Sequence, residues 1–417
     1  MTPNSRDNAP TPPIMAGFPV PPEWRVPLDQ LDAAPWNRWS FQHMRELVPT
    51  VEVRRGADVW DLPGGGGDVD AIPCTDARGA PSSWGAMLDA THADAALVWL
   101  DGRVIAECYR NGMDARRPHL AMSVTKSVVG AVAGCLIGEG LLDPAAPVTG
   151  LAPELRRTAW AGATLQQVLD MTTGVRFDES YGRPGADIML IDVAAGWKPP
   201  FPWMDPASVP GCVWDVVLGL RERDAPHGAR FAYRSIETDV LGVLMERAAG
   251  MRLADLVSAR LWAPMGAAED GYFTVDRAGF ALADGGFNAC LRDYARFGRL
   301  LAEDGARDGR QVIPKAWIAD IRAGAHGLFD DAHRGIFPEG RYRNQFWVID
   351  RRHRAHLSLG IHGQHLLVDP DRGLVAVKLS SWPDPLGDNG AHLAHWLNAV
   401  EALARAHGAP AAGWWPG

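Results

Sequence analysis

The sequence lacks a hydrophobic run long enough to span a membrane. Its longest apolar stretch, residues 128–138, is shorter than the roughly 20 residues that a membrane-spanning helix needs. That stretch also contains three glycines, which suit a tightly packed core helix. The first thirteen residues have neither the basic cluster nor the apolar segment of a secretory signal. We therefore expect no membrane association and a cytoplasmic location.

Positive charge and paired cysteines are also scarce. The 41 Lys and Arg residues are outnumbered by 50 Asp and Glu, and the net charge of -9 predicts no nucleic-acid partner. No Cys-x-x-Cys pair occurs, so the five widely spaced cysteines are predicted to be reduced and mostly buried thiols. They are Cys74, Cys108, Cys135, Cys212 and Cys290. His392 and His395 have a metal-like spacing but no evident third ligand, so we expect no metal and no organic cofactor.

Two common enzyme motifs are absent. The glycines at 64–67 are not followed by Gly-Lys-Ser/Thr, which excludes a phosphate-binding loop. No Gly-x-Ser-x-Gly occurs, so an α/β-hydrolase has little support. The proline-rich residues before this glycine loop are predicted to form an extension on the surface.

The patterns that are present predict an α+β fold. Strand-like runs at 95–100 and 103–109 flank an Asp-Gly turn, and further strands are expected at 345–349, 366–368 and 374–379. Helical patterns cover 165–172, 213–223, 235–249 and 392–406. We predict one antiparallel sheet flanked by helices, built from residues 79–142 and 287–417. A mainly helical domain over 143–286 would be inserted, and 1–78 would be an N-terminal extension.

The strongest chemical signal is Ser123 followed three residues later by Lys126, at the start of the apolar segment. On a helix, both side chains lie on one face, so the amine can take the proton of the hydroxyl and make it a nucleophile. A plainer alternative is an N-cap serine followed by a solvated lysine. Two later segments decide between them: Tyr233-Arg234-Ser235 at a loop-to-helix junction, and Gly360-Ile361-His362 before a strand.

With these three motifs in order, the chain resembles the serine β-lactamase and penicillin-binding-protein superfamily. Its closest likeness is to the branch of 6-aminohexanoate-dimer hydrolases and class C β-lactamase-like esterases. Supporting phrases include residues 169–174, 233–242 and 285–298, and the likeness runs from about Ala95 to Asn398. The resemblance implies a β-lactamase/transpeptidase-like fold and an acyl-enzyme mechanism.

The resemblance also implies roles for individual residues. Ser123 would be the nucleophile, Lys126 its base, and Tyr233 the relay that protonates the leaving group. The backbone N–H groups of Ser123 and Ile361 would form the oxyanion hole. We expect the positive end of the helix to disfavour the ammonium form of Lys126, with Tyr233 sharing the proton.

Four more residues match positions around the substrate in this branch or lie close to them. Tyr181 and Trp347 would line the pocket, although a tryptophan in this position can equally belong to the core. Asp192, placed on the same loop as Tyr181, could pair with a cationic amine of the substrate. His362 could be a second base, or a structural histidine beside the oxyanion strand.

Two departures from the superfamily motifs shape the expected substrate. Ser235 stands where many relatives have asparagine, and Gly360-Ile361-His362 replaces Lys-Thr-Gly. The missing lysine and hydroxyl normally hold a carboxylate, so their loss argues against penicillin recognition. We expect cleavage of short linear amides or esters, with a 6-aminohexanoate oligomer as the best candidate. The alternatives are a β-lactamase or D-alanyl-D-alanine carboxypeptidase, and a non-catalytic binding protein. The oligomeric state stays open, and a homodimer is one option.

Overall fold

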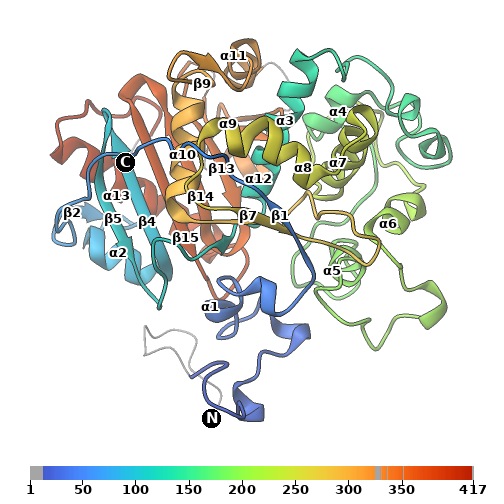
Figure 1. Ribbon diagram of the computed structural model, residues 1–417, viewed down its shortest axis with the longest axis horizontal. Coiled ribbons are helices and arrows are strands. Elements are labelled where there is room, and N and C mark those ends of the chain that lie inside the picture. Colours follow the sequence, from blue (N-terminus) through green and yellow to red (C-terminus); the bar gives the residue numbers. More distant parts are fainter. Residues whose placement is uncertain (1–12, 325–328, 330, 336, 351, 416–417) are drawn as a thin grey trace.

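The computed structural model describes residues 13–324, 329, 331–335, 337–350 and 352–415. Within these ranges the chain forms an α+β architecture around a seven-stranded sheet, in the order β11-β12-β13-β14-β15-β4-β5 (Figure 1). The strands are β1 Thr50–Val53, β2 Pro73–Thr75, β3 Pro81–Ser83, β4 Ala93–Leu100, β5 Arg103–Tyr109, β6 His119–Leu120, β7 Gly271–Thr274, β8 Phe287–Ala289, β9 Ala306–Arg307, β10 Arg310–Gln311, β11 Arg341–Arg343, β12 Phe346–Val348, β13 His356–Gly360, β14 Gln364–Asp369 and β15 Leu374–Ser380. The helices are α1 Asn37–Ser40, α2 Trp84–Ala90, α3 Val124–Gly138, α4 Leu165–Leu169, α5 Ile188–Ala194, α6 Val213–Gly219, α7 Ile236–Ala249, α8 Leu253–Val257, α9 Ala263–Met265, α10 Leu291–Ala302, α11 Lys315–Ala323, α12 Asp331–Arg334 and α13 Ala391–Ala406.

The large sheet is antiparallel throughout and joins distant parts of the sequence, as predicted. The hairpin β4–β5 turns at Asp101 and Gly102, which both have the positive φ that such a two-residue turn needs. Strand β15, from the C-terminal part, pairs with β4 from the N-terminal part. Every residue of these two strands is buried, because helices cover both faces of the sheet.

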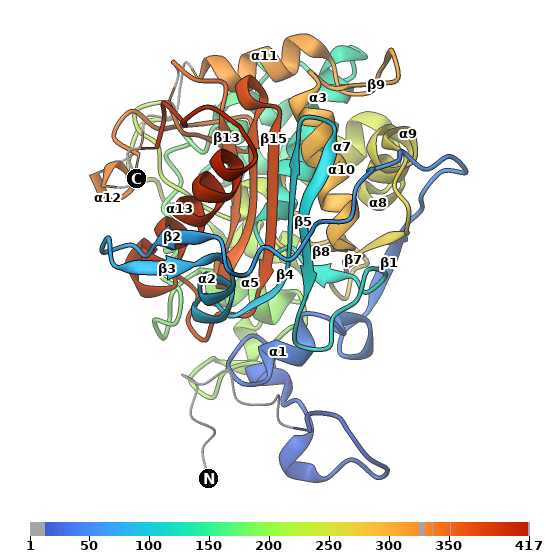
Figure 2. The ribbon, with the colours of Figure 1, turned by 90° about the vertical axis from the view of Figure 1, so that its left-hand side faces the viewer.

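Two helical layers enclose the sheet (Figure 2). One face packs on α3 and α10, and the other packs on α2 and α13. Neighbouring residues of β4 therefore point to opposite faces of the sheet. Leu97 belongs to the hydrophobic cluster on the side of α3 and α10, and Val98 belongs to the cluster on the side of α2 and α13. Close packing explains the glycines of α3: a Cβ on Gly134 would lie 2.3 Å from the Trp317 ring.

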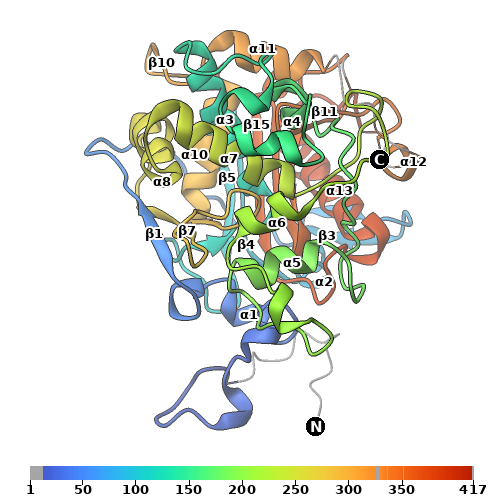
Figure 3. The same ribbon diagram turned by 90° about the vertical axis from the view of Figure 1, so that its right-hand side faces the viewer.

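The predicted helices between residues 143 and 286 are present, and two of them, α4 and α6, end three or four residues earlier than predicted. They gather beside α3, on the side that Figure 3 faces. Gly250 ends α7 with a φ of 64°, as its expected capping role requires. These helices share one hydrophobic cluster with the large sheet.

The N-terminal segment is more than a surface extension. Its strand β1 pairs with β7, and the side chains of Leu31, Phe41 and Met44 are fully buried. The segment therefore contributes to the core as well as to the surface, because its loops place these apolar side chains in the hydrophobic cluster.

The structure also bears on membrane spans, metal sites and the state of the cysteines. Within the described ranges, no helix has the length and apolar character to cross a membrane, and no cluster of three or more His, Cys, Asp or Glu is suited to a metal ion. All five cysteines are free thiols. Cys135 and Cys290 are buried, whereas the other three are half-buried.

Candidate active site

Ser123 and Lys126 lie together at the start of α3. Ser123 immediately precedes the helix, and the Nζ atom of Lys126 donates a hydrogen bond of 2.8 Å to its Oγ atom. Lys126 is 1% exposed, while Ser123 is half-buried and borders a cavity. Met122, just before the serine, has a φ of 46°, a strained value for a residue with a side chain. This sharp entry into α3 leaves the hydroxyl open to the cavity.

Lys126 makes two further hydrogen bonds that favour its ammonium form. Nζ donates to Ser235 Oγ at 3.0 Å and to the carbonyl oxygen of Asp284 at 2.7 Å. Burial alone would lower the pKa of Lys126, but Tyr233, Asp284 and Glu179 outweigh it and leave this pKa above its usual value. This direction is opposite to the one expected from the helix end alone. Three acceptors and nearby acids dominate over the field of the helix end.

Tyr233 belongs to the same cluster. Its ring stacks on Trp347 with centroids 5.2 Å apart, and Lys126 Nζ lies 5.2 Å from the ring centroid. Burial raises the pKa of Tyr233, while the charge of Lys126 and a hydrogen bond with Ser123 act in the opposite direction. The hydroxyl, the amine and the phenol thus meet in one place.

Ile361 borders the same cavities as the nucleophile and lies in a 3-10 turn that follows β13. The preceding Gly360 allows this approach, because a Cβ there would lie 2.7 Å from the carbonyl oxygen of Ala121. Ser123 and Ile361 line the same two cavities. This placement is compatible with the predicted pair of N–H donors.

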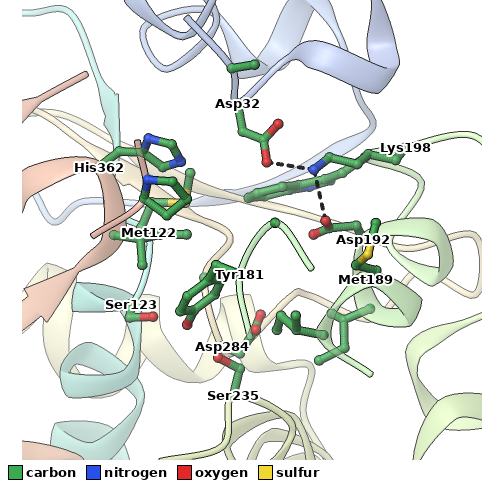
Figure 4. Close-up of a pocket in the computed structure, with 18 of the residues that line it drawn as sticks. Asp32, Met122, Ser123, Tyr181, Met189, Asp192, Lys198, Ser235, Asp284 and His362 are labelled. Atoms are coloured by element: carbon green, nitrogen blue, oxygen red, sulfur yellow. Dashed lines mark hydrogen bonds and ion pairs between the residues drawn. The ribbon is translucent and has the colours of Figure 1, made fainter. Parts of the chain in front are cut away.

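Two cavities meet at Ser123, and both also border Tyr181, Ile361 and Pro385. The first has a volume of about 250 Å³ and is drawn in Figure 4. The second has a volume of about 420 Å³ and mainly aromatic and aliphatic walls. The walls of the second include Phe329, Phe337, Trp347, Leu359, Trp382 and Leu393.

The first cavity ends in three charged side chains, at the opposite end from Ser123 and Ser235 (Figure 4). Lys198 Nζ lies 2.8 Å from Asp32 Oδ2 and 3.1 Å from Asp192 Oδ2. Burial raises the pKa of Asp192 to about 6, with Lys198 opposing and Asp32 adding to the rise. Asp192 is on α5 rather than on the loop of Tyr181, and its carboxylate already has an internal cation.

The remaining predicted pocket residues also lie at these cavities. Trp347 is both wall and core, being 8% exposed and stacked on Tyr233. The His362 ring borders the first cavity, but its Nδ1 atom is hydrogen-bonded to the Trp382 carbonyl oxygen at 2.8 Å. Burial lowers the pKa of His362, so the imidazole is neutral. This anchoring favours its structural interpretation over a second base.

Sequence reasoning missed Glu179, which holds two of the site residues. It accepts hydrogen bonds from Tyr181 Oη at 2.7 Å and from the backbone N–H of Ser235 at 3.0 Å. Burial raises the pKa of Glu179, while Lys126 and Ser235 lower it. Nothing in the local sequence marks this carboxylate, although it lies only two residues from Tyr181.

A buried acid pair behind Lys126 was also missed. Asp239 Oδ1 accepts hydrogen bonds from the backbone N–H groups of Ala283, at 3.0 Å, and Asp284, at 3.2 Å. Burial raises the pKa of both Asp239 and Asp284, and their proximity raises that of Asp239 further. The Gly285-Gly286-Phe287 phrase noted in the sequence is the signal that could have directed attention to Asp284.

Comparison with known protein families identifies this arrangement. Residues 86–401 match the family model described as Beta-lactamase. The chain belongs to the beta-lactamase family. This result confirms the predicted fold class and the predicted serine hydrolase family.

Individual known proteins are similar over most of the chain. A 6-aminohexanoate-dimer hydrolase of Paenarthrobacter ureafaciens is 38% identical over 361 residues, covering 86% of this chain and 88% of the relative. A solved Bacillus anthracis structure, provisionally named a 6-aminohexanoate-dimer hydrolase, has a TM-score of 0.82 at 27% identity and covers 91% of this chain and 98% of its own. An octameric penicillin-binding protein homologue from Pyrococcus abyssi shares the fold, with a TM-score of 0.57, 17% identity and 75% of each chain covered.

Proposed function

We propose that this chain hydrolyses short linear amides and esters through an acyl-enzyme on Ser123, with the 6-aminohexanoate dimer as its best candidate substrate. The observation that carries the proposal is the contact of Lys126 Nζ with Ser123 Oγ, at 2.8 Å, beside Tyr233 and at the junction of two cavities. The 38% identical relative of that name supports the substrate class. The side chains of the site supply both a nucleophile and a proton-transfer group.

The proton path follows from the resting state of the cluster. Because Lys126 rests as an ammonium, the coupled pair of Lys126 and Tyr233 must first lose one proton to act as a base. Ser123 Oγ then bonds to the carbonyl carbon as its proton moves to this pair, and the carbonyl oxygen becomes an oxyanion. When the C–N or C–O bond breaks, the same proton goes to the leaving group. Water then attacks the carbonyl carbon of the acyl-enzyme as its proton moves to the same pair. The bond to Ser123 Oγ breaks, Oγ takes the proton back, and the acid is released.

The oxyanion would be stabilised by the N–H groups of Ser123 and Ile361. Each such donor is worth about 3 kcal/mol in the transition state. Gly360 is the residue that permits this geometry, since its backbone lies against Ala121.

The shape of the first cavity supports a linear substrate with a cationic end. Apolar side chains, including Met122, Ile188 and Met189, line the same cavity as the nucleophile and the charged group. That group of Asp32, Lys198 and Asp192 has two carboxylates for one ammonium. An ω-amino group would neutralise it, as the predicted pairing of Asp192 with an amine requires.

A β-lactamase or D-alanyl-D-alanine carboxypeptidase is the weaker candidate. In place of a third-motif lysine, the chain has Gly360-Ile361-His362, and His362 is neutral and bonded to the backbone. A carboxylate of a penicillin would find no cation there. Nitrocefin turnover as fast as short-ester cleavage would reverse this ranking. The cytoplasmic location and a homodimer stay predictions.

A p-nitrophenyl ester separates an enzyme from a non-catalytic binding protein of the same fold. The wild-type chain is expected to release a burst of p-nitrophenol followed by steady turnover, and then to cleave the 6-aminohexanoate dimer. Ser123→Ala should abolish both reactions. The matched control is Ser127→Ala, which removes a buried hydroxyl of the same helix that bonds to the Gln345 carbonyl oxygen at 2.9 Å. Equal loss in both variants, or a burst that survives Ser123→Ala, would contradict the proposal.

A further inference from the structure

The second cavity contains a histidine that the proposed chemistry does not use. His365 lines this cavity, is 3% exposed, and makes no hydrogen bond with any described residue through either ring nitrogen. Its ring contacts two indoles, with centroids 5.3 Å from Trp382 and 4.8 Å from Trp396. A buried imidazole without a partner is costly, so it marks a place where a polar ligand group would be bound.

The surroundings of His365 are basic. On the neighbouring strand, Lys378 stands directly opposite, and its Nζ atom donates to Ser380 Oγ at 2.7 Å. His392, on α13, adds a second imidazole close to both groups. Two acids act on this cluster: Asp94 of β4, whose two carboxylate oxygens already accept hydrogen bonds from other side chains, and Asp388, which faces His392.

These basic groups are held neutral or nearly so by burial and by one another. Burial and the neighbouring Lys378 keep the pKa of His365 well below its usual range. Burial lowers the pKa of Lys378 to about 7. A bound anion would oppose both effects, so protonation of this cluster and binding of an anion would be mutually favourable.

We propose that the His365 end of the second cavity binds a carboxylate at the far end of the substrate, opposite the scissile bond. This inference rests on the proposed function for its link to catalysis. The two cavities that meet at Ser123 then have opposite character. One is lined by the acid-rich Asp32–Lys198–Asp192 group, and the other is lined by His365, with Lys378 and His392 close to that histidine. Such a site fits a linear molecule with an ammonium at one end and a carboxylate at the other.

The apolar walls of the second cavity make a polar partner necessary for a bound carboxylate. A carboxylate entering among Phe329, Phe337 and Leu393 without a partner would lose its hydration with no compensation. His365 lines this cavity and has a ring that can supply such a hydrogen bond. An uncharged amide would gain less, because a hydrogen bond to a charged group is the stronger one.

Binding of hexanoate and of hexanamide, measured by titration calorimetry, tests the inference without requiring turnover. Hexanoate is expected to bind the wild-type chain at least about tenfold more tightly than hexanamide, the ratio that one charge-assisted hydrogen bond provides. His365→Leu should abolish this preference while the chain stays folded, with a thermal midpoint no lower than that of the wild type. His365→Gln, which keeps an N–H donor, should retain part of the preference.

Lys198→Met supplies the matched control, because Lys198 is the cation of the other cavity. The preference for hexanoate is expected to survive this change. Loss of the preference in Lys198→Met, or equal binding of hexanoate and hexanamide by the wild-type chain, would overturn the inference. A chain that prefers hexanoate but cleaves neither esters nor the dimer would keep the carboxylate site and refute the proposed function.

Discussion

Glu179 accepts two hydrogen bonds from Ser235, one from its backbone N–H at 3.0 Å and one from its hydroxyl at 2.5 Å. The hydroxyl is thereby committed as a donor, and its lone pairs are left to accept the hydrogen bond from Lys126 at 3.0 Å. Ser235 thus links a carboxylate to the ammonium beside the nucleophile. The carboxylate both orients the serine and stabilises the charge of Lys126.

Glu179→Gln should shift the pH dependence of hydrolysis. The Glu179 carboxylate raises the pKa values of Lys126 and Tyr233, so its removal lowers both. Because the active form has lost one proton from this pair, it would appear at a lower pH. The kcat/KM profile for a p-nitrophenyl ester is expected to move to lower pH by up to about one unit. Glu222→Gln, on an exposed ion pair, should leave the profile unchanged, and a shift to higher pH would contradict this role.

Tyr233→Phe should damage amide cleavage more than ester cleavage. An amine must receive a proton as it leaves, whereas p-nitrophenolate leaves without one. Loss of a positioned proton donor is expected to lower amide turnover by about 10²- to 10⁴-fold. The measurement is the ratio of amide to p-nitrophenyl ester kcat/KM. Tyr342→Phe is the control, since that ring lies 5.9 Å from the ring of Tyr233. An unchanged ratio in Tyr233→Phe would exclude the relay.

Gly360→Ala should lower kcat by moving the Ile361 N–H. The added Cβ would lie 2.7 Å from the Ala121 carbonyl oxygen and 3.0 Å from the Met122 Cβ. Relief of this clash costs about 1–3 kcal/mol of stability and displaces the turn. A fall in kcat with little change in KM is expected for both esters and amides. Gly67→Ala, where a Cβ would meet nothing within 4 Å, is the control. Full activity in Gly360→Ala would argue against an oxyanion role for Ile361.

The parts of the fold that could be predicted are those with a local signal. The Asp101-Gly102 turn requires positive φ, and alternation and apolar runs mark β4, β5 and β15. Ser123 and Lys126 are one helical turn apart, so their contact follows from the helix itself. The resemblance added the placement of Tyr233, which no local rule brings to Lys126.

The rest depends on contacts between distant irregular segments. Glu179 reaches Ser235 from a loop, and Asp32 reaches Lys198 from the N-terminal segment. Neither pairing has a periodicity or spacing that a single sequence reveals. The pKa of Lys126 shows the same dependence, because Asp284 and Glu179, which raise it, lie in other segments. The expectation counted the helix end but not the Asp284 carbonyl oxygen, which lies in another segment.

Lys378→Met should stabilise the chain at neutral pH. Lys378 is fully buried, and burial lowers its pKa to about 7, against a usual value of 10.5. Between these two values the unfolded chain binds the proton and the folded chain does not, so the stability of the wild type falls as pH decreases from about 10 to about 7. Methionine fills a similar volume and does not titrate, so it removes the free-energy cost of keeping this amine uncharged in the folded chain.

The expected gain for Lys378→Met is on the order of a few kcal/mol at pH 7 and shrinks toward pH 10. Chemical denaturation of both chains at pH 7 and pH 9 measures it. The control is Lys315→Met, since that side chain is 73% exposed and pairs only with Asp304 at 3.4 Å. It should leave the pH dependence as it is. A Lys378→Met chain that is less stable than wild type at pH 7 would show that the hydrogen bond to Ser380 outweighs the cost of keeping the amine uncharged.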